Sequence, residues 1–146
     1  MDAVTVRELE IPSDVELVAP VLTQLRDHLT PILLEERLEQ MAMEGYRLFG
    51  AFDNDEVRAV AGIRTGTNLY YGLYCWVDDL VTAADARSQG YGSTLLEWVA
   101  MWARDEGCAI LALSSGLERN RAHQFYEDSV DMERASYVFT LDLEPA

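Results

Sequence analysis

The sequence predicts an α/β (α+β) fold in which a mixed, mostly antiparallel sheet is flanked by helices. Three observations lead to this class. Two apolar runs joined by Asp53-Asn54-Asp55 have the pattern of a hairpin, a strand–helix–strand unit follows them, and residues 109–113 form a continuous apolar run typical of a buried central strand. With 146 residues and no linker, repeat or low-complexity segment, we expect one domain spanning residues 1–146.

The first third of the chain contains one short strand and two helices. Residues 4–8 alternate between apolar and polar and predict a first strand. Ser13 and Glu16 have the spacing of a capping box, which predicts a helix with Val18, Val21 and Leu22 on one face. Thr30 followed by Pro31 predicts the start of a second helix, because proline is favoured in a first helical turn.

The middle of the chain is rich in strands. Residues 47–52 and 57–63 predict the two arms of the hairpin. A turn at residues 68–72 then leads into a long strand at residues 73–81. These three strands follow one another without a helix, which favours antiparallel pairing among them.

The last part of the chain returns to alternating helices and strands. A helix begins after Gly90 and ends near Gly107, and the buried strand at residues 109–113 follows it. We expect a short helix at residues 120–127 and a closing strand at residues 135–143, where apolar and polar residues alternate again. The predicted order is therefore β-α-α-β-β-β-α-β-α-β.

The chain is strongly acidic, with 26 acidic and 11 basic residues and a net charge of −15. All 11 basic residues are arginine. Such a field repels nucleic acid, so we expect no nucleic-acid partner. The charge has two interpretations that can coexist: an adaptation for solubility, including solubility at high salt, and steering of a cationic substrate.

Neither a membrane segment nor a metal site is expected. No apolar stretch approaches the ~20 residues of a membrane span, and no basic flank precedes an apolar leader. Cys75 and Cys108 are isolated from each other, and the only histidines are His28 and His123. This pattern supports neither a metal centre nor a disulfide framework, and it fits a cytoplasmic protein.

The most informative segment is residues 76–92, where an apolar strand runs into a loop that closes with Arg87-x-x-Gly90-x-Gly92 and continues as a helix. The first N–H groups of a helix have no intrahelical acceptor, and glycines let the backbone approach an anion closely. A mononucleotide P-loop is excluded because the chain has no lysine. A dinucleotide site is disfavoured because no third glycine follows at the required spacing.

The same segment resembles the pyrophosphate loop, Q/R-x-x-G-x-G/A, of the GNAT superfamily of acyl-CoA-dependent N-acetyltransferases. Residues 119–126, Arg-Asn-Arg-Ala-His-Gln-Phe-Tyr, resemble the second signature of that family, N-x-x-A-x-x-F-Y, at the expected distance. The resemblance covers nearly the whole chain and is to the small single-domain bacterial or archaeal type. It implies a GNAT-like sheet whose fourth and fifth strands splay apart to admit the pantetheine arm of the cofactor.

The resemblance implies acetyl-CoA as co-substrate, without a metal. The residues it places at the cofactor are Leu80, Val81, Arg87, Ser88, Gln89, Gly90, Tyr91, Gly92, Ser93 and Asn120. Two departures from the family pattern affect this set. The loop after Val81 is one residue longer than usual, so the backbone contacts could shift to Thr82. The family asparagine falls on Arg119, so Asn120 is one position away and has a second interpretation as a helix cap.

Three residues are the candidates for catalysis. Tyr126 matches the tyrosine that protonates the leaving thiolate in many relatives, and a phenol with an ordinary pKa of about 10 is protonated at neutral pH. Its alternative role is packing beside Phe125. Asp78 and Asp79 are adjacent in a predicted strand, so we expect one of them to face the cleft at the strand's end. The resemblance implies the role, since in related enzymes an acidic residue near this position relays a proton from the amine or binds a cationic substrate. The alternative role of the two aspartates is to bond loop N–H groups.

The resemblance therefore implies an enzyme that transfers acetyl from acetyl-CoA directly to a primary amine on a small molecule or a peptide. A non-catalytic acyl-CoA-binding regulatory module remains the alternative. A third option, acetylation of RNA-linked amines, is disfavoured by the net charge of −15. The identity of the acceptor is not predicted, and homodimers are left open because they are common among relatives.

Overall fold

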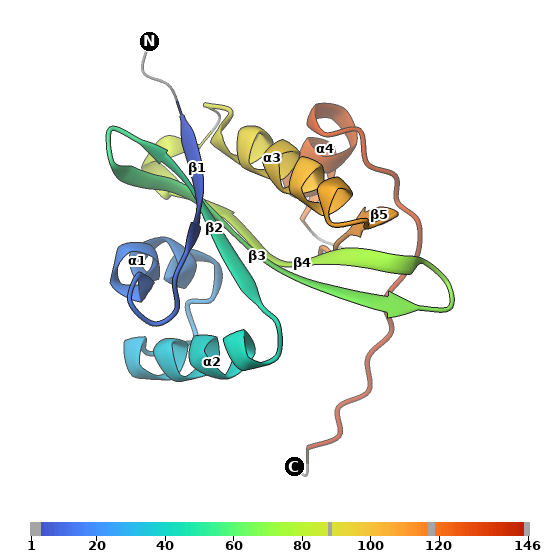
Figure 1. Ribbon diagram of the computed structural model, residues 1–146, viewed down its shortest axis with the longest axis horizontal. Helices are drawn as coiled ribbons and strands as arrows, with labels where there is room; N and C mark the ends of the chain where they lie inside the picture. Colours follow the sequence, from blue (N-terminus) through green and yellow to red (C-terminus); the bar gives the residue numbers. More distant parts are fainter. Residues whose placement is uncertain (1–3, 88, 117–118, 145–146) are drawn as a thin grey trace. The chain divides into compact units, whose positions relative to one another are not determined.

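The computed structural model describes residues 4–87, 89–116 and 119–144 (Figure 1). The chain divides into two compact units, Met1–Leu113 and Ser114–Ala146. The larger unit holds the entire sheet and the three longest helices. Of the residues predicted for the site, Asn120 and Tyr126 belong to the smaller unit and the others to the larger one.

The sheet of the larger unit has five strands in the order β1-β2-β3-β4-β5. The first four pair antiparallel, and the fifth pairs parallel to β4. The predicted mixed, mostly antiparallel sheet is therefore confirmed. The strands are β1 (Thr5–Leu9), β2 (Arg47–Asp53), β3 (Glu56–Asn68), β4 (Gly72–Thr82) and β5 (Ile110–Ala112).

The larger unit has three helices: α1 (Val15–Leu25), α2 (Pro31–Met43) and α3 (Tyr91–Asp105). As predicted, α2 begins at Pro31, and the hydroxyl of Thr30 accepts the N–H of Leu33 at 3.2 Å. The predicted capping box at α1 is not formed. Asp14 is the N-cap there, and its carboxylate instead accepts the N–H of Glu10 at 2.8 Å, outside the helix.

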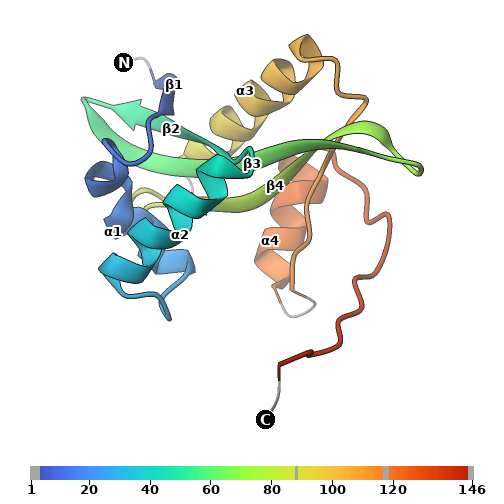
Figure 2. The same ribbon diagram turned by 60° about the horizontal axis from the view of Figure 1, so that its bottom comes forward.

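Helices cover both faces of the sheet (Figures 1 and 2), with α1 and α2 on one face and α3 on the other. The central strand β3 is therefore buried on both sides, and residues 59–63 are all fully buried. On the α3 face, Phe49 packs against Trp98 and Trp102 with ring centroids 5.1 and 5.4 Å apart. This two-sided burial explains why β3 has a run of apolar residues and not a simple alternation.

A β-bulge interrupts β4 near its middle. Gly62 pairs with Asp79 and Ile63 pairs with Val77, so Asp78 has no partner in the register. Gly62 has a packing role at this point, because a β-carbon there would overlap the ring of Tyr46. The bulge and the glycine together position the carboxylates that are described below.

The smaller unit contains α4 (Asn120–Gln124), which continues into a wider helical turn at Phe125–Ser129. The predicted helix at residues 120–127 is therefore present. The predicted closing strand at residues 135–143 is wrong, since no described strand pairs with this segment. Its sequence alternates, but alternation alone does not form a strand without the hydrogen bonds of a neighbour. The large apolar side chains there are exposed, among them Tyr137, Phe139, Leu141 and Leu143.

Candidate active site

Gly90 is the N-cap of α3 and has the left-handed backbone conformation, with φ at +86°. This conformation favours glycine, because a β-carbon would meet the following carbonyl oxygen. A β-carbon built at Gly90 would have no other atom within 4 Å. Backbone conformation therefore explains the glycine in this position, and crowding by the rest of the protein does not.

The first turn of α3 offers backbone donors to an anion. The first hydrogen bond of the helix joins the N–H of Thr94 to the carbonyl of Gly90 at 3.0 Å. Within residues 4–87, 89–116 and 119–144, no acceptor is found for the N–H groups of Tyr91, Gly92 and Ser93. Such unpaired N–H groups at the positive end of a helix dipole form a general anion-binding arrangement.

The loop that leads into α3 is anchored to two neighbouring elements. The N–H of Ala83 donates to the carbonyl of Arg58 on β3 at 2.8 Å, and the N–H of Ala84 donates to the side chain of Gln24 on α1 at 2.9 Å. A short 3-10 turn at Ala84–Ala86 follows. These contacts fix the path of the loop, although the sequence gives no sign of them.

The edge of β4 that faces β5 is open beside this loop. The two strands pair only from Tyr74 and Ile110 to Trp76 and Ala112, so no described strand pairs with residues 77–82 on that side. Within the larger unit, this separation agrees with the splay that the resemblance implies. Leu80 and Val81, two of the predicted cofactor residues, lie on this open stretch, and their other edge pairs with β3.

The side chains of the predicted loop residues differ in their surroundings. Tyr91 is buried and its hydroxyl donates to Asp53 at 2.6 Å, which raises the pKa of Tyr91. The Tyr91 side chain therefore points into the protein, and only its backbone is available to a ligand. Arg87 and Gln89 are exposed, and Arg87 forms no ion pair within the described part of the chain. Ser88 lies outside the described residues.

Two residues that the sequence analysis missed support the loop. Asp53 accepts the Tyr91 hydrogen bond, and Arg58 lies between Glu56 at 2.9 Å and Asp85 at 3.8 Å. Both come from the β2–β3 hairpin, where Asp53 belongs to the predicted turn and Arg58 to the predicted strand, and neither carries a signal of a functional role. The hydrogen bond and the ion pair therefore connect the hairpin to the loop at Asp85 and to the start of α3.

Asp79 is almost enclosed by hydrogen-bond donors. Arg26 donates through Nε to Oδ1 at 3.0 Å, and the hydroxyl of Tyr46 donates to Oδ2 at 2.8 Å. Only 12% of the Asp79 side chain is exposed. Burial, followed by the charge of Asp79, raises the pKa of Tyr46 well above its ordinary value, so this phenol stays protonated.

Asp78 is more open than its neighbour. Its Oδ2 accepts Nε of Arg64 at 2.8 Å, its backbone carbonyl accepts Nη2 of Arg26 at 3.1 Å, and 23% of its side chain is exposed. The expected separation of the two carboxylates onto opposite faces assumes a regular strand, and the bulge interrupts that alternation. Both aspartates instead join one network, which we call the bulge cluster: Arg26, Tyr46, Arg64, Asp78 and Asp79.

In the smaller unit, Tyr126 is partly buried and packs edge to face against Phe125, with ring centroids 5.4 Å apart. Burial raises the pKa of Tyr126 above its ordinary value, so the phenol is protonated at neutral pH. The N-cap of α4 is Arg119, and no side chain caps this helix. The alternative role of Asn120 as a cap is therefore not seen.

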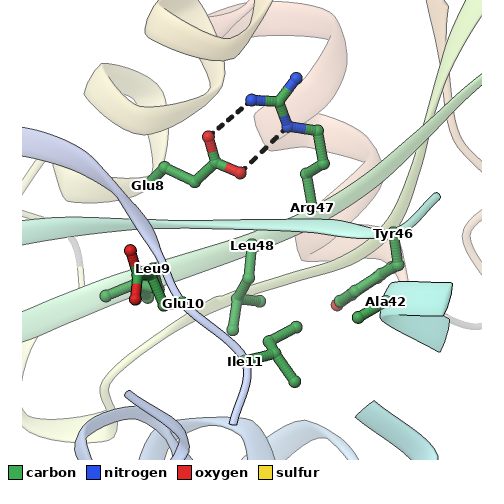
Figure 3. Close-up of a pocket in the computed structure, with 8 residues that line it drawn as sticks. All are labelled: Glu8, Leu9, Glu10, Ile11, Ala42, Tyr46, Arg47 and Leu48. Atoms are coloured by element: carbon green, nitrogen blue, oxygen red, sulfur yellow. Dashed lines mark hydrogen bonds and ion pairs between the residues drawn. The ribbon is translucent and has the colours of Figure 1, made fainter. Parts of the chain in front are cut away.

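One pocket of about 470 Å³ is lined by residues of β1, β2 and their flanks (Figure 3). In the sheet, β1 and β2 lie on the side of β4 opposite to its open edge. Arg47 and Glu8 form a two-point ion pair across the pocket, with distances of 3.0 and 2.6 Å. The pocket contains none of the predicted site residues and shares only Tyr46 with the bulge cluster. Among the described residues, no group of His, Cys, Asp or Glu side chains could hold a metal ion, and no helix has the length and apolar character needed to cross a bilayer.

The structure resembles solved acetyltransferases over nearly its full length. The aminoglycoside N-acetyltransferase AAC(6')-Iy, solved in complex with CoA, superposes with a TM-score of 0.85 at 13% identity, covering 98% of this chain and 97% of that one. Glucosamine-6-phosphate N-acetyltransferase from Arabidopsis thaliana gives a TM-score of 0.75 at 17% identity, covering 98% and 100%. At these identities the likeness establishes the fold.

Sequence relatives establish the family. The chain is 39% identical over 121 residues to the Uncharacterized N-acetyltransferase YhdJ of Bacillus subtilis (strain 168), covering 82% of this chain and 85% of the relative. It is 33% identical over 82 residues to the aminoalkylphosphonate N-acetyltransferase of Salmonella typhimurium, covering 56% and 52%. The model of the Acetyltransferase (GNAT) family matches residues 15–130, and the chain is therefore a member of the GNAT family of acetyltransferases.

Proposed function

We propose that the protein transfers an acetyl group from acetyl-CoA directly to the primary amine of a small molecule. Two features of the described residues carry this proposal. The N–H groups at the start of α3 have no acceptor among these residues, and no described strand pairs with the edge of β4 at residues 77–82. The N–H groups at the start of α3 suit a diphosphate. The edge of β4 suits an extended pantetheine arm, which can form hydrogen bonds with backbone groups as an added strand does.

In this proposal the cofactor diphosphate binds the backbone at Gly90, Tyr91, Gly92 and Ser93. Arg87 supplies a local positive charge, which matters because the net charge of −15 repels an anionic cofactor. The pantetheine arm follows Leu80 and Val81. The remaining proposed contacts come from Ser88, Gln89 and Asn120. No metal takes part.

The chemistry needs a neutral amine, a stabilised oxyanion and a proton for the leaving group. The amine nitrogen attacks the thioester carbonyl, and N–H groups of the open β4 edge stabilise the developing negative charge on oxygen. The carbon–sulfur bond then breaks, and Tyr126 donates its proton to the CoA thiolate. The attacking nitrogen loses its extra proton as the amide forms, and this proton restores the Tyr126 phenol, directly or through solvent. A phenol with a raised pKa suits this task because it holds its proton until the thiolate forms.

The two aspartates take different roles in this proposal. Both carboxylate oxygens of Asp79 already accept hydrogen bonds from Arg26 and Tyr46, so we assign Asp79 to positioning. Asp78 keeps one oxygen, Oδ1, without a partner within the described residues. We therefore assign Asp78 to the acceptor ammonium, which it would bind and then deprotonate.

Relatives support a small-molecule acceptor and turnover. One sequence relative is named for aminoalkylphosphonates, and one structural neighbour is named for aminoglycosides. Family membership favours turnover over the non-catalytic binding module. We propose further that the enzyme works in the cytoplasm and has no nucleic-acid partner, in keeping with its acidic surface.

The test combines binding and turnover. Calorimetry with acetyl-CoA should show one site per chain, and thiol release across a panel of amines should show acetylation. Tyr126→Phe should retain acetyl-CoA binding and lose most of its turnover, whereas the matched variant Tyr70→Phe, at a tyrosine that is 83% exposed, should retain both. Absence of acetyl-CoA binding would contradict the proposal, as would full turnover by Tyr126→Phe.

A further inference from the structure

The bulge cluster contains two arginines whose donors are only partly used. A guanidinium carries five N–H donors. Arg26 uses Nε and Nη2 on the aspartates, and Arg64 uses Nε on Asp78 and Nη1 on Glu44 at 3.4 Å. Within the part of the chain that the structure describes, Nη1 of Arg26 and Nη2 of Arg64 have no acceptor.

The side chains that carry these donors are partly exposed to solvent. The side chain of Arg26 is 41% exposed and that of Arg64 is 38% exposed. Asp78 and Asp79 are less exposed, at 23% and 12%, so guanidinium edges lie outside these two carboxylates, whereas Glu44, the other partner of Arg64, is 49% exposed. A ligand that approaches Asp78 therefore meets positive charge beside the one uncommitted carboxylate oxygen.

The cluster lies next to the place where the proposed reaction occurs. Asp78 precedes Leu80 by two residues on the strand with the open edge, a separation of about 7 Å at the usual rise per residue. Arg26 reaches the same point from the end of α1, and Arg64 reaches it from β3. Donors from two elements therefore converge on Asp78 beside the acceptor end of the proposed site.

The arrangement of charge discriminates among amines. A simple alkylamine or a diamine would gain Asp78 but would offer no acceptor to the free Nη donors of the two guanidinium groups. An amine that also carries a phosphonate, phosphate or carboxylate would supply the acceptor that both arginines lack. Guanidinium groups bind such oxyanions with charge-assisted and often two-point hydrogen bonds.

We propose that the acetyl acceptor is a small zwitterionic amine, whose anionic group binds Arg26 and Arg64 while its ammonium group binds Asp78. This inference rests on the proposed function and adds the substrate class to it. The net charge of −15 would by itself favour a purely cationic acceptor, so the two predictions can be separated by experiment.

The experiment compares amines of matched length under saturating acetyl-CoA: aminopropylphosphonate, propylamine and diaminopropane. Thiol release gives kcat/KM for each. We expect aminopropylphosphonate to exceed both others by at least about tenfold, the equivalent of one hydrogen bond between charged groups. A second readout is calorimetric binding of aminopropylphosphonate to the protein saturated with CoA.

Two variants test whether Arg26 and Arg64 cause the preference for aminopropylphosphonate. Arg64→Gln should lower the ratio of kcat/KM for aminopropylphosphonate over propylamine, mainly through KM. Arg26→Lys keeps the charge but loses the planar fork, and should lower the same ratio less. Because the ratio is internal to each preparation, partial misfolding does not change it. The control is Arg104→Gln, at an exposed arginine on α3, which should leave the ratio unchanged.

The outcomes separate this inference from the proposed function. Equal or faster acetylation of propylamine or diaminopropane would overturn the zwitterion proposal and leave the acetyltransferase proposal standing. If Arg64→Gln left the ratio of kcat/KM for aminopropylphosphonate over propylamine unchanged, the zwitterion proposal would also be overturned and the acetyltransferase proposal would stand. Failure to acetylate any amine, together with absence of aminopropylphosphonate binding, would overturn both.

Discussion

Replacing Gly90 by alanine tests the start of α3 directly. Gly90 has a φ of +86°, where an L-residue costs roughly 1–2 kcal/mol because its β-carbon approaches the next carbonyl oxygen. No other atom lies within 4 Å of the added carbon, so steric crowding adds nothing to this cost in free energy. We therefore expect Gly90→Ala to lower the free energy of unfolding by about 1–2 kcal/mol and the Tm by roughly 2–8 °C.

The same substitution should weaken acetyl-CoA binding. If alanine shifts the backbone out of the left-handed region, the N–H groups of residues 91–93 turn away from a common point. Loss of about 1.4 kcal/mol of binding would raise the Kd tenfold, and we expect a change of that order. Urea unfolding gives the stability, and calorimetry with acetyl-CoA gives the Kd.

Gly107 offers a matched control at the opposite end of the same helix. It lies just beyond the other end of α3, has a φ of +91°, and a β-carbon there would meet only Leu73 at an ordinary 3.6 Å. Gly107→Ala should therefore cost about the same stability while leaving the acetyl-CoA Kd unchanged. Gly90→Asn should recover part of the loss, because asparagine tolerates the left-handed region. Equal effects of Gly90→Ala and Gly107→Ala on the Kd would refute the reasoning.

Three further predictions concern other residues. Tyr126→Phe should lower kcat by about 10²–10⁴, the usual contribution of a general acid, with little change in KM. Because burial raises the pKa of Tyr126, the proton is present below that raised pKa, and kcat measured against pH should fall only above the ordinary tyrosine range. Tyr46→Phe removes a 2.8 Å hydrogen bond to a partly buried carboxylate and should lower the free energy of unfolding by about 1.5–3 kcal/mol. Urea melts measure this loss, and an unchanged midpoint would contradict it. Burial raises the pKa of Cys75 to about 12, so its thiolate fraction at pH 8 is on the order of 10⁻⁴. Cys75 should therefore resist Ellman's reagent in the native protein and react after denaturation, while the more exposed Cys108 reacts first.

Much of the fold follows from local patterns in the sequence. The β2–β3 hairpin, Pro31 at the start of α2 and the helix after Gly90 were predictable because each depends on neighbours in the chain. The strand predicted at residues 135–143 depends instead on a distant partner, which alternation does not specify. A pattern of apolar residues reports which face would be buried, and not whether a neighbouring strand is present.

The site was predictable in part for the same reason. The glycines at the start of α3 form a motif, and the structure gives Gly90 the left-handed conformation that the motif requires. The partners of the two aspartates come from far along the chain, Arg26 at 53 residues from Asp79 and Tyr46 at 33, and no motif marks them. The bulge at Asp78 could not be predicted from the sequence either, because it arises from a register shift between two paired strands.

The packing of Tyr46 over Gly62 makes three positions interdependent: Tyr46 just before β2, Gly62 on β3 and Asp79 on β4. Any larger residue at position 62 would displace the phenol, and the carboxylate at position 79 would then lose one of its two donors. Gly62, which has no side chain, therefore determines whether Asp79 keeps its hydrogen bond from Tyr46 at the bulge. Among homologues, substitutions at positions 46, 62 and 79 should therefore occur together.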